Sequence, residues 1–233
     1  MELYFGQSYG DHSITLDEDE SNHLLKVNRK NIGDSVFVTD GEGRLFTTQL
    51  IEKTKRNCIL EIKSVTQTKE RNQKLHIAIA PTKSIDRLEW FLEKATESGI
   101  DEITFLVCRH SERRDLKEER LKRVLIAAMK QSLKTFLPKL NPVIDFNDFV
   151  KRENADLKLI FTTTAPPEKN LKINYQKGTS LTALVGPEGD FHESELELAQ
   201  NNGYIYTTLG PSRLRTETAG INVCMLYNFI NSF

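Results

Sequence analysis

The stretch LVGPEGDF, residues 184–191, joins an apolar run to a charged segment with helical spacing. A second stretch, LGPSRLRTETAG at 209–220, has the same form further along the chain. In a parallel sheet, ligands bind beyond the carboxyl ends of the strands, where glycine permits close approach of the backbone and proline fixes the turn. Both stretches are therefore candidate ligand-binding turns, although two ordinary strand-to-helix turns would have the same spacing.

Neither stretch has the pattern of a phosphate-binding loop, because GxxxxGK[ST] and GxGxxG are absent from both. A nucleoside that is held mainly by backbone groups is therefore a better candidate ligand than a triphosphate.

The segments around these turns predict an α/β fold. From Leu75 onward, strand patterns alternate with helical patterns, which is typical of a mostly parallel sheet. Strands are predicted near 75–80, 102–107, 157–162, 181–185 and 204–208. Helices are predicted at 84–98, 116–134, 192–202 and 216–231.

Residues 1–70 have a different pattern. Apolar and polar residues alternate over short runs, and turn signals such as Asp40-Gly41-Glu42-Gly43 separate these runs. This pattern indicates short antiparallel strands and a small barrel. The charged stretch QTKERNQK, residues 67–74, has the composition of a linker. We therefore expect two domains, at 1–70 and 75–233.

Composition narrows the class of protein. The chain of 233 residues is 38% hydrophobic and 28% charged, which is typical of a globular protein with a sizeable core. No apolar run approaches the length of a membrane span, and the N-terminus lacks the regions of a signal peptide, so we expect no membrane partner and a cytoplasmic location. Cys58, Cys108 and Cys224 show no metal-ligand spacing, so we expect reduced thiols and no metal.

The charge distribution is uneven, although the net charge is only −1. Between Arg109 and Lys139, ten basic residues stand against four acidic ones. Such an excess favours contacts with RNA phosphates, which provide affinity without sequence information. A solvated helix face with pairs such as Glu119 and Arg123 would produce the same composition.

Six segments together carry a family resemblance: HLLKVNR (23–29), GDSVFVTDGEG (33–43), KSIDRLEWFLEKATESGI (83–100), RHSERR (109–114), LVGPEGDF (184–191) and LGPSRLRTETAG (209–220). They resemble the RsmE family of SPOUT-superfamily methyltransferases, which modify N3 of a uridine in 16S ribosomal RNA of the small subunit. The resemblance implies a PUA-like β-barrel followed by a parallel α/β domain with a C-terminal trefoil knot. It also implies a homodimer that acts on the assembled small subunit rather than on free rRNA.

The same resemblance implies that S-adenosylmethionine binds, in a bent form, within the knot. Gly186, Gly189 and Gly210 would be small because a side chain would occupy cofactor space, and Leu214 would form an apolar wall for the adenine. The implied cofactor-binding residues are Phe161, Thr162, Val185, Gly186, Pro187, Glu188, Gly189, Leu209, Gly210, Leu214 and Thr216.

Two residues of the last motif are candidates for catalysis. Arg215 could stabilise negative charge on the uracil oxygens as N3 loses its proton, or it could only pair with Glu188 or Glu217 and brace the knot. Glu217 could accept that proton, or it could be a first-turn carboxylate that favours the helix dipole. The general base stays unassigned at this point.

The candidate RNA-binding residues are basic positions within the resembling segments and the basic cluster. They are Arg29, Lys83, Arg87, Arg109, Arg113, Arg114 and Lys134. His110 receives no catalytic role, and Trp90 is predicted to be a core residue rather than a platform for a base.

The sequence departs from the family pattern at three places. Ser212 stands where the family usually has arginine, which puts the role of that arginine in doubt. Asp190 stands where many members have a second glycine. Lys134 replaces an arginine, and because an ammonium group cannot form a bidentate fork we expect a weaker RNA contact there.

Two other functions are compatible with parts of the sequence. A non-catalytic rRNA-binding protein would be expected to have damaged glycine turns, whereas both are intact. A nucleotide-dependent oxidoreductase would be expected to have GxGxxG after its first strand, and this pattern is missing.

Overall fold

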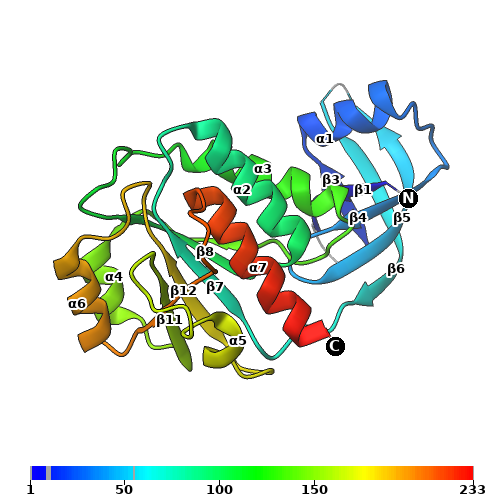
Figure 1. Cartoon of the computed structure of the whole chain (residues 1–233). Coiled ribbons are helices and arrows are strands. Elements are labelled where there is room, and N and C mark those ends of the chain that lie inside the picture. The colour runs from blue at the N-terminus through cyan, green and yellow to red at the C-terminus, as the bar shows by residue number, and fades with distance from the viewer. Residues whose placement is uncertain (1, 9–11, 55, 233) are drawn as a thin grey trace. The chain divides into compact units, whose positions relative to one another are not determined.

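The computed structural model describes residues 2–54 except 9–11, and residues 56–232, and they form two compact units (Figure 1). The first unit comprises the chain up to Glu70 together with Ile126–Leu137. The second comprises Arg71–Leu125 and the chain from Pro138 onward. The predicted second domain, 75–233, includes residues 126–137, whereas the structure groups them with the first unit.

The first unit is a curled six-stranded sheet with the strand order β1-β4-β5-β6-β3-β2. Only Gly6 separates β1 from β2 although these strands are at opposite ends of that order, so the sheet curls until its edges meet, as in a barrel. A Cβ on Gly6 would lie 3.0 Å from Ile14, which explains the glycine at this joint. The strands are β1 (Leu3–Phe5), β2 (Gln7–Ser8), β3 (Ser13–Leu16), β4 (Ser35–Thr39), β5 (Arg44–Lys53) and β6 (Cys58–Gln67).

A short helical segment follows β3. Helix α1 (Glu18–Asn22) begins where the side chain of Asp17 accepts a hydrogen bond from the amide of Glu20, and it continues as a π-helical turn, His23–Val27. Leu24 of this turn is fully buried and packs into the barrel core. The core of the first unit also contains Tyr4, Ile14, Leu16, Val36, Val38, Phe46, Leu50, Cys58 and Leu60.

Backbone hydrogen bonds explain why residues 126–137 belong to the first unit. The amide of Gly43 donates to the carbonyl of Thr135 at 2.8 Å, and the amide of Leu137 donates to the carbonyl of Gly41 at 2.8 Å. Gly43 has φ 93°, and a Cβ there would lie 2.4 Å from the ring of Phe136. The β4–β5 turn therefore fits residues 135–137 closely, and glycine is required at that contact.

The second unit contains a sheet in which every strand pair is parallel. The strand order is β10-β8-β7-β12-β11-β13, and β9 also pairs with β8. The five predicted strands are confirmed, whereas the two-residue strands β9 and β10 were not predicted. The bounds are β7 (Leu75–Ile79), β8 (Glu102–Val107), β9 (Lys139–Leu140), β10 (Ile144–Asp145), β11 (Leu157–Phe161), β12 (Leu181–Val185) and β13 (Ile205–Thr207).

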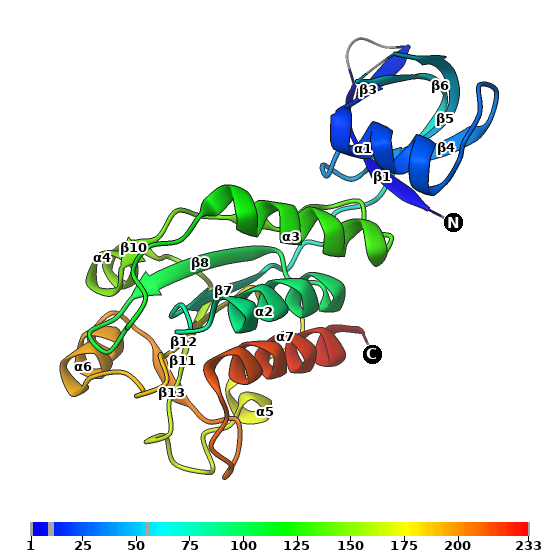
Figure 2. The ribbon, with the colours of Figure 1, turned by 90° about the horizontal axis from the view of Figure 1, so that it is seen from above.

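Helices cover the sheet, and α2 and α7 lie side by side (Figure 2). Because side chains alternate along a strand, Ala78 contributes to the core with α4 and α6, while Ile79 lies on the side of α7 next to Gly220. The helices are α2 (Ile85–Ser98), α3 (Glu118–Gln131), α4 (Phe146–Arg152), α5 (Leu171–Asn174), α6 (Glu193–Asn201) and α7 (Thr216–Ser232). None of the helices in the described ranges has both the length and the apolar character that crossing a bilayer requires.

The order of the elements makes the last part of the chain cross the sheet. Strand β13 is the edge strand beside β11, whereas α7 packs against β7 and β12 in the middle of the sheet. The connection 208–215 therefore passes the carboxyl ends of β11 and β12. This crossing brings the second glycine turn next to the first.

Arg71 fixes the start of the second unit. Its guanidinium forms an ion pair with Asp101, donates to the side-chain oxygen of Asn228 and to the carbonyl of Gly99, and lies 5.6 Å from the centre of the Tyr227 ring. The planar guanidinium group of Arg71 thus joins the α2–β8 turn to α7.

We predict that Arg71→Ala lowers the free energy of unfolding by about 1–3 kcal/mol, because it removes several partly buried charge-assisted hydrogen bonds. Arg71→Lys should recover only part of this loss, since an ammonium group cannot reproduce the fork. Urea unfolding measures both variants. The matched control is Arg152→Ala, whose exposed pair with Asp148 spans 3.8 Å and should contribute less than about 0.5 kcal/mol.

Candidate functional site

A cavity of about 680 Å³ lies at the carboxyl edge of the parallel sheet. Its walls come from three segments: 161–167 after β11, 185–190 after β12, and 208–219, which includes the crossing connection and the start of α7. The cavity contains all eleven residues predicted to bind the cofactor, namely Phe161, Thr162, Val185, Gly186, Pro187, Glu188, Gly189, Leu209, Gly210, Leu214 and Thr216.

The cavity also contains residues that the sequence analysis did not assign to it. They follow the same strands, so the rule that ligands bind at carboxyl strand ends could have identified them. These residues are Thr163, Ala165, Pro167, Asp190, Thr208, Pro211, Ser212, Arg213 and Ala219.

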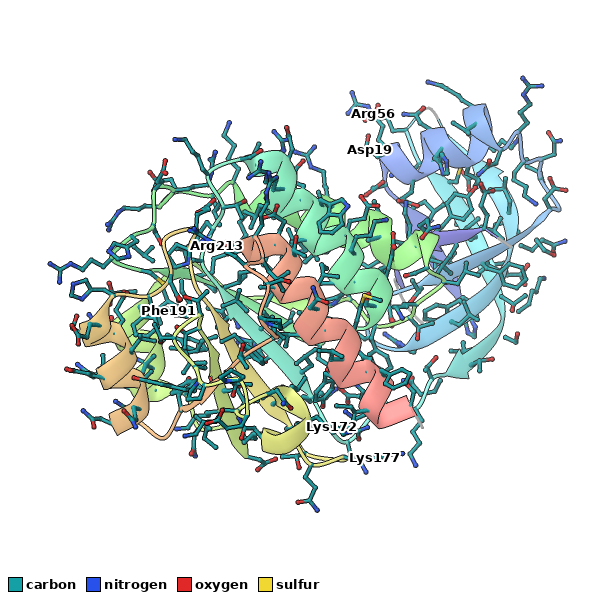
Figure 3. The ribbon with its side chains drawn as sticks, viewed as in Figure 1. Asp19, Arg56, Lys172, Lys177, Phe191 and Arg213 are labelled. Atoms are coloured by element: carbon teal, nitrogen blue, oxygen red, sulfur yellow. The ribbon has the colours of Figure 1, made fainter. Side chains whose placement is uncertain are left out.

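Hydrogen bonds hold the walls of this cavity together. The hydroxyl of Thr216 donates to the carbonyl of Gly186 at 2.9 Å in a buried contact. Arg213, three residues before the start of α7 (Figure 3), donates from Nη2 to the carbonyl of Glu188 at 3.3 Å. The start of α7 and the first glycine turn are therefore tied at two points.

The three glycines of the turns differ in what surrounds them. A Cβ on Gly186 would lie 3.1 Å from the ring of buried Phe191, so packing within the protein alone favours glycine there (Figure 3). A Cβ on Gly189 would make an ordinary contact with His110 at 3.7 Å. Gly210 has φ 116°, and a Cβ there would meet nothing within 4 Å. Among the three, Gly210 thus borders open space.

A second cavity, of about 340 Å³, lies on the other side of the chain at the start of α7. Leu214 and Thr216 line the first cavity, whereas Arg215 and Glu217 line the second. The structure thus places the predicted catalytic pair together, but in a different cavity from the predicted cofactor residues. The remaining residues of the second cavity are Asp86, Arg87, Trp90 and Thr218.

Glu217 is buried and lies opposite Arg87, with Nε of the arginine 3.7 Å from Oε1 of the carboxylate. Glu188 accepts a hydrogen bond from the amide of Lys83 at 3.1 Å. Within the described residues, Arg215 forms no ion pair with Glu188 or Glu217. The described residues therefore lack the ion pair through which, in the alternative interpretation, Arg215 would brace the knot.

Trp90 was predicted to be a core residue, and this prediction is wrong. The buried face of α2 is formed by Leu88, Phe91, Leu92 and Ala95, and Trp90 is displaced from that face. Its side chain is 43% exposed and lines the second cavity. Apolar character alone could not distinguish these positions, because the tryptophan lies next to the buried stripe in sequence.

Several predicted RNA-binding residues lie on the loops at the carboxyl edge. Lys83 forms an ion pair with Glu112 at 2.8 Å, which raises the pKa of the lysine and keeps it charged. Arg113 donates to the carbonyls of Thr82 and Lys83, so its guanidinium also holds the β7–α2 loop. Arg109 and Arg114 are exposed.

The other predicted RNA-binding residues lie elsewhere. Arg87 lines the second cavity opposite Glu217. Arg29 and Lys134 belong to the first unit. Arg29 has φ 52°, a left-handed conformation that is uncommon for a residue with a side chain. The predicted set is therefore divided between the two units.

The three cysteines lie at buried positions. Burial raises the pKa of Cys108, which follows β8, so its thiol stays protonated. Cys58, Cys108 and Cys224 are all buried, and none of the three forms a disulfide. In the ranges that the structure describes, no three His, Cys, Asp or Glu side chains gather in a way that could hold a metal ion.

Comparisons with known proteins match both units of the chain. An RNA methyltransferase domain model matches residues 69–228, and an RNA methyltransferase PUA domain model matches residues 16–63. The ribosomal RNA small subunit methyltransferase E of Rickettsia conorii is 29% identical over 99% of this chain and 96% of the relative.

Solved structures agree with this match. A probable rRNA-methyltransferase from Porphyromonas gingivalis has a TM-score of 0.91 and 36% identity, covering 100% of this chain and 99% of the other. The ribosomal RNA small subunit methyltransferase E of Neisseria gonorrhoeae, bound to S-adenosyl methionine, has a TM-score of 0.86 and 23% identity, covering 99% and 98%. The first domain is thus a PUA-like domain, the second is a parallel α/β methyltransferase domain, and the chain belongs to the ribosomal RNA small subunit methyltransferase E family.

Proposed function

We propose that this protein transfers a methyl group from S-adenosylmethionine to N3 of a specific uridine in the 16S ribosomal RNA of the small subunit. The observation that carries the proposal is the cavity at the carboxyl edge of the sheet, in a chain of this family. Its walls contain all the residues predicted to hold the cofactor. In this proposal the first unit and the basic loops bind RNA, and the second unit binds the cofactor.

The cavity suits S-adenosylmethionine in size and in chemical groups. A volume of about 680 Å³ is ample for a nucleoside with an amino-acid tail. Val185 and Leu214 offer apolar surface for an adenine, while backbone groups of the two turns and the hydroxyl of Thr162 offer polar partners. Open space at Gly210 leaves room for a ligand. When bound, the cofactor supplies the methyl group on a sulfonium centre.

We further propose that the crossing connection forms part of a C-terminal trefoil knot. Two features support it: residues 208–215 pass the ends of two strands, and Thr216 is tied back to Gly186. A knot of this kind would hold both glycine turns against one ligand. Such threading is rare among folds in general.

The second cavity supplies groups that fit the removal of a proton from uracil N3. The target uracil must be unpaired to enter a pocket, because its N3 is engaged in base pairing within a duplex. In this proposal Glu217 accepts the N3 proton, and Arg215 stabilises the charge that develops on the adjacent carbonyl oxygens. In-line transfer also requires uracil N3 to reach the methyl group in the first cavity, so the uracil has to lie where the two cavities adjoin, at residues 214–217.

The assembled small subunit is the proposed substrate, and the cytoplasm is the proposed location. Three buried thiols that form no disulfide are consistent with a reducing compartment. Methylation of small subunits and of free 16S rRNA, followed by digestion and mass spectrometry of the nucleosides, tests both the product and the preferred substrate.

Calorimetric titration with S-adenosylmethionine, NAD and ATP separates the proposal from its alternatives. Binding of S-adenosylmethionine alone supports the methyltransferase. Preference for NAD or ATP would support another nucleotide-dependent enzyme. Absence of binding to all three, with RNA binding retained, would support a non-catalytic rRNA-binding protein.

We predict that Gly210→Val weakens S-adenosylmethionine binding by about tenfold or more, because the side chain would enter the cavity. Gly178→Val is a matched control: Gly178 also has positive φ (89°) and open surroundings, but it does not line the cavity. Both variants should lower the thermal midpoint, and only Gly210→Val should lower the affinity. Equal affinities in the two variants would remove Gly210 from the site.

Arg109 and Arg114 provide a test of RNA binding, since both are exposed and Arg113 has a role in the loop. We predict that each change to Ala reduces the slope of log affinity against log salt by about 0.7–0.9 for every phosphate that the arginine neutralises. The control is Arg152→Ala, in the last turn of α4 and outside the lining of both cavities, which should leave the slope unchanged. Unchanged slopes for Arg109→Ala and Arg114→Ala would mean that these arginines are only solvated charges on a surface loop.

We also propose that the protein is a homodimer in which α7 contributes to the interface. Met225, Leu226 and Phe229 are 57%, 40% and 66% exposed. A cluster of large apolar side chains on one helix is unfavourable in water and is typical of a binding surface.

We predict that Met225→Glu yields folded monomers with impaired methylation, because a charge would be buried in the interface. Light scattering measures the mass, and the nucleoside assay measures activity. Ile205→Glu, at another exposed apolar position of the second unit, should leave the dimer intact. A fully active monomer would contradict both the dimer and its role in activity.

A further inference from the structure

Asp190, at the end of the first glycine turn, has an unusual backbone conformation. Its φ is 62°, and among the described residues only Arg29 and Leu133 share a positive φ with a side chain present. Glycine is favoured in this left-handed region, and aspartate tolerates it better than most residues. A compensating interaction is therefore expected at Asp190.

The carboxylate of Asp190 supplies that interaction. Its Oδ2 accepts hydrogen bonds from the hydroxyl of Thr162 at 3.0 Å, from the amide of Thr163 at 2.9 Å and from the hydroxyl of Thr163 at 2.6 Å. Its Oδ1 accepts from the amide of Phe191 at 2.8 Å. The carboxylate thus binds four donors, three of them on a different loop.

Three of these donors and the acceptor belong to two different loops that both line the first cavity. Thr162 and Thr163 follow β11, whereas Asp190 follows β12, and all three residues line the cavity. Backbone pairing between β11 and β12 ends at Phe161 and Val185. Beyond this point, the Asp190 carboxylate replaces the sheet hydrogen bonds as a link between the two loops.

A further contact connects Asp190 to a third loop. Nδ1 of His110 lies 3.0 Å from the carbonyl oxygen of Asp190, so the imidazole donates a hydrogen bond to it. The amide of Asp190 donates to the carbonyl of Pro187 at 2.9 Å, which closes the turn. Both the side chain and the backbone of this residue are thus fixed before any ligand binds.

We propose that Asp190 is a positioning residue that holds the β11 and β12 loops at the separation that the cofactor requires. This inference rests on the proposed cofactor site. Loops that are already ordered lose less conformational freedom when a ligand binds, so a preformed cavity has higher affinity for the same contacts. Asp190 acts through Thr162 and Thr163, and needs no contact of its own with the cofactor.

Asp190→Gly is the main test, because glycine accepts φ 62° without strain and removes the carboxylate, although it also makes the backbone of the turn more flexible. We expect S-adenosylmethionine affinity, measured by calorimetry, to fall about tenfold, since cavity preorganisation is removed. In this variant the KM for the cofactor should rise while kcat changes little. In Asp190→Asn, which keeps one acceptor oxygen, the affinity for S-adenosylmethionine should fall only about threefold. Hydrogen exchange at the Thr163 amide should become faster in the Gly variant even without cofactor.

Thr163→Val completes a double-mutant cycle, since valine keeps the shape of threonine and removes one donor. If Asp190 acts through this loop, Thr163→Val weakens binding in the wild type and has no further effect in the Asp190→Gly background. Additive effects would show that the aspartate acts by another route and would overturn the inference. So would an Asp190→Gly variant with wild-type affinity. Absence of cofactor binding by the wild type would instead overturn the proposed function.

Discussion

The buried hydrogen bond from the hydroxyl of Thr216 to the carbonyl of Gly186 joins the two glycine turns. Strand β13 lies at the edge of the sheet, whereas α7 packs against the middle of the sheet. The connection 208–215 therefore has to be anchored where it reaches the start of α7. Once Thr216 is fixed, alternate residues before and after it face different cavities. Leu214 lines the larger cavity, and Arg215 and Glu217 line the smaller one.

The parallel sheet and the larger cavity were predictable because they depend on local patterns and one general rule. A strand buried on both faces is a continuous apolar run, and LTALV at 181–185 is such a run. The carboxyl ends of parallel strands share one edge, so the turns after β12 and β13 had to lie along the same edge of the sheet. The family resemblance then supplied the individual residues, and all of those assigned to the cofactor line the cavity.

The features that escaped prediction depend on interactions between distant segments. Strands β9 and β10 have two residues each, too few to show a period. No pattern in residues 126–137 could reveal that Thr135 pairs with the β4–β5 turn. Gly186 was assigned to the ligand, yet the ring of Phe191 already accounts for its lack of a side chain. A sequence motif indicates a candidate ligand there, but it does not reveal which side chains pack around the glycine.

The barrel has a consequence for the order in which the molecule can fold during translation. Its strands leave the ribosome before those of the second unit, but the amide of Gly43 and the carbonyl of Gly41 pair with Thr135 and Leu137. Those partners are synthesised only after residues 71–125, which belong to the other unit. A nascent chain that ends at Glu70 therefore has an incomplete barrel whose β4–β5 turn is hydrogen-bonded to water. Completion of the N-terminal domain must wait until a large part of the following domain has been made.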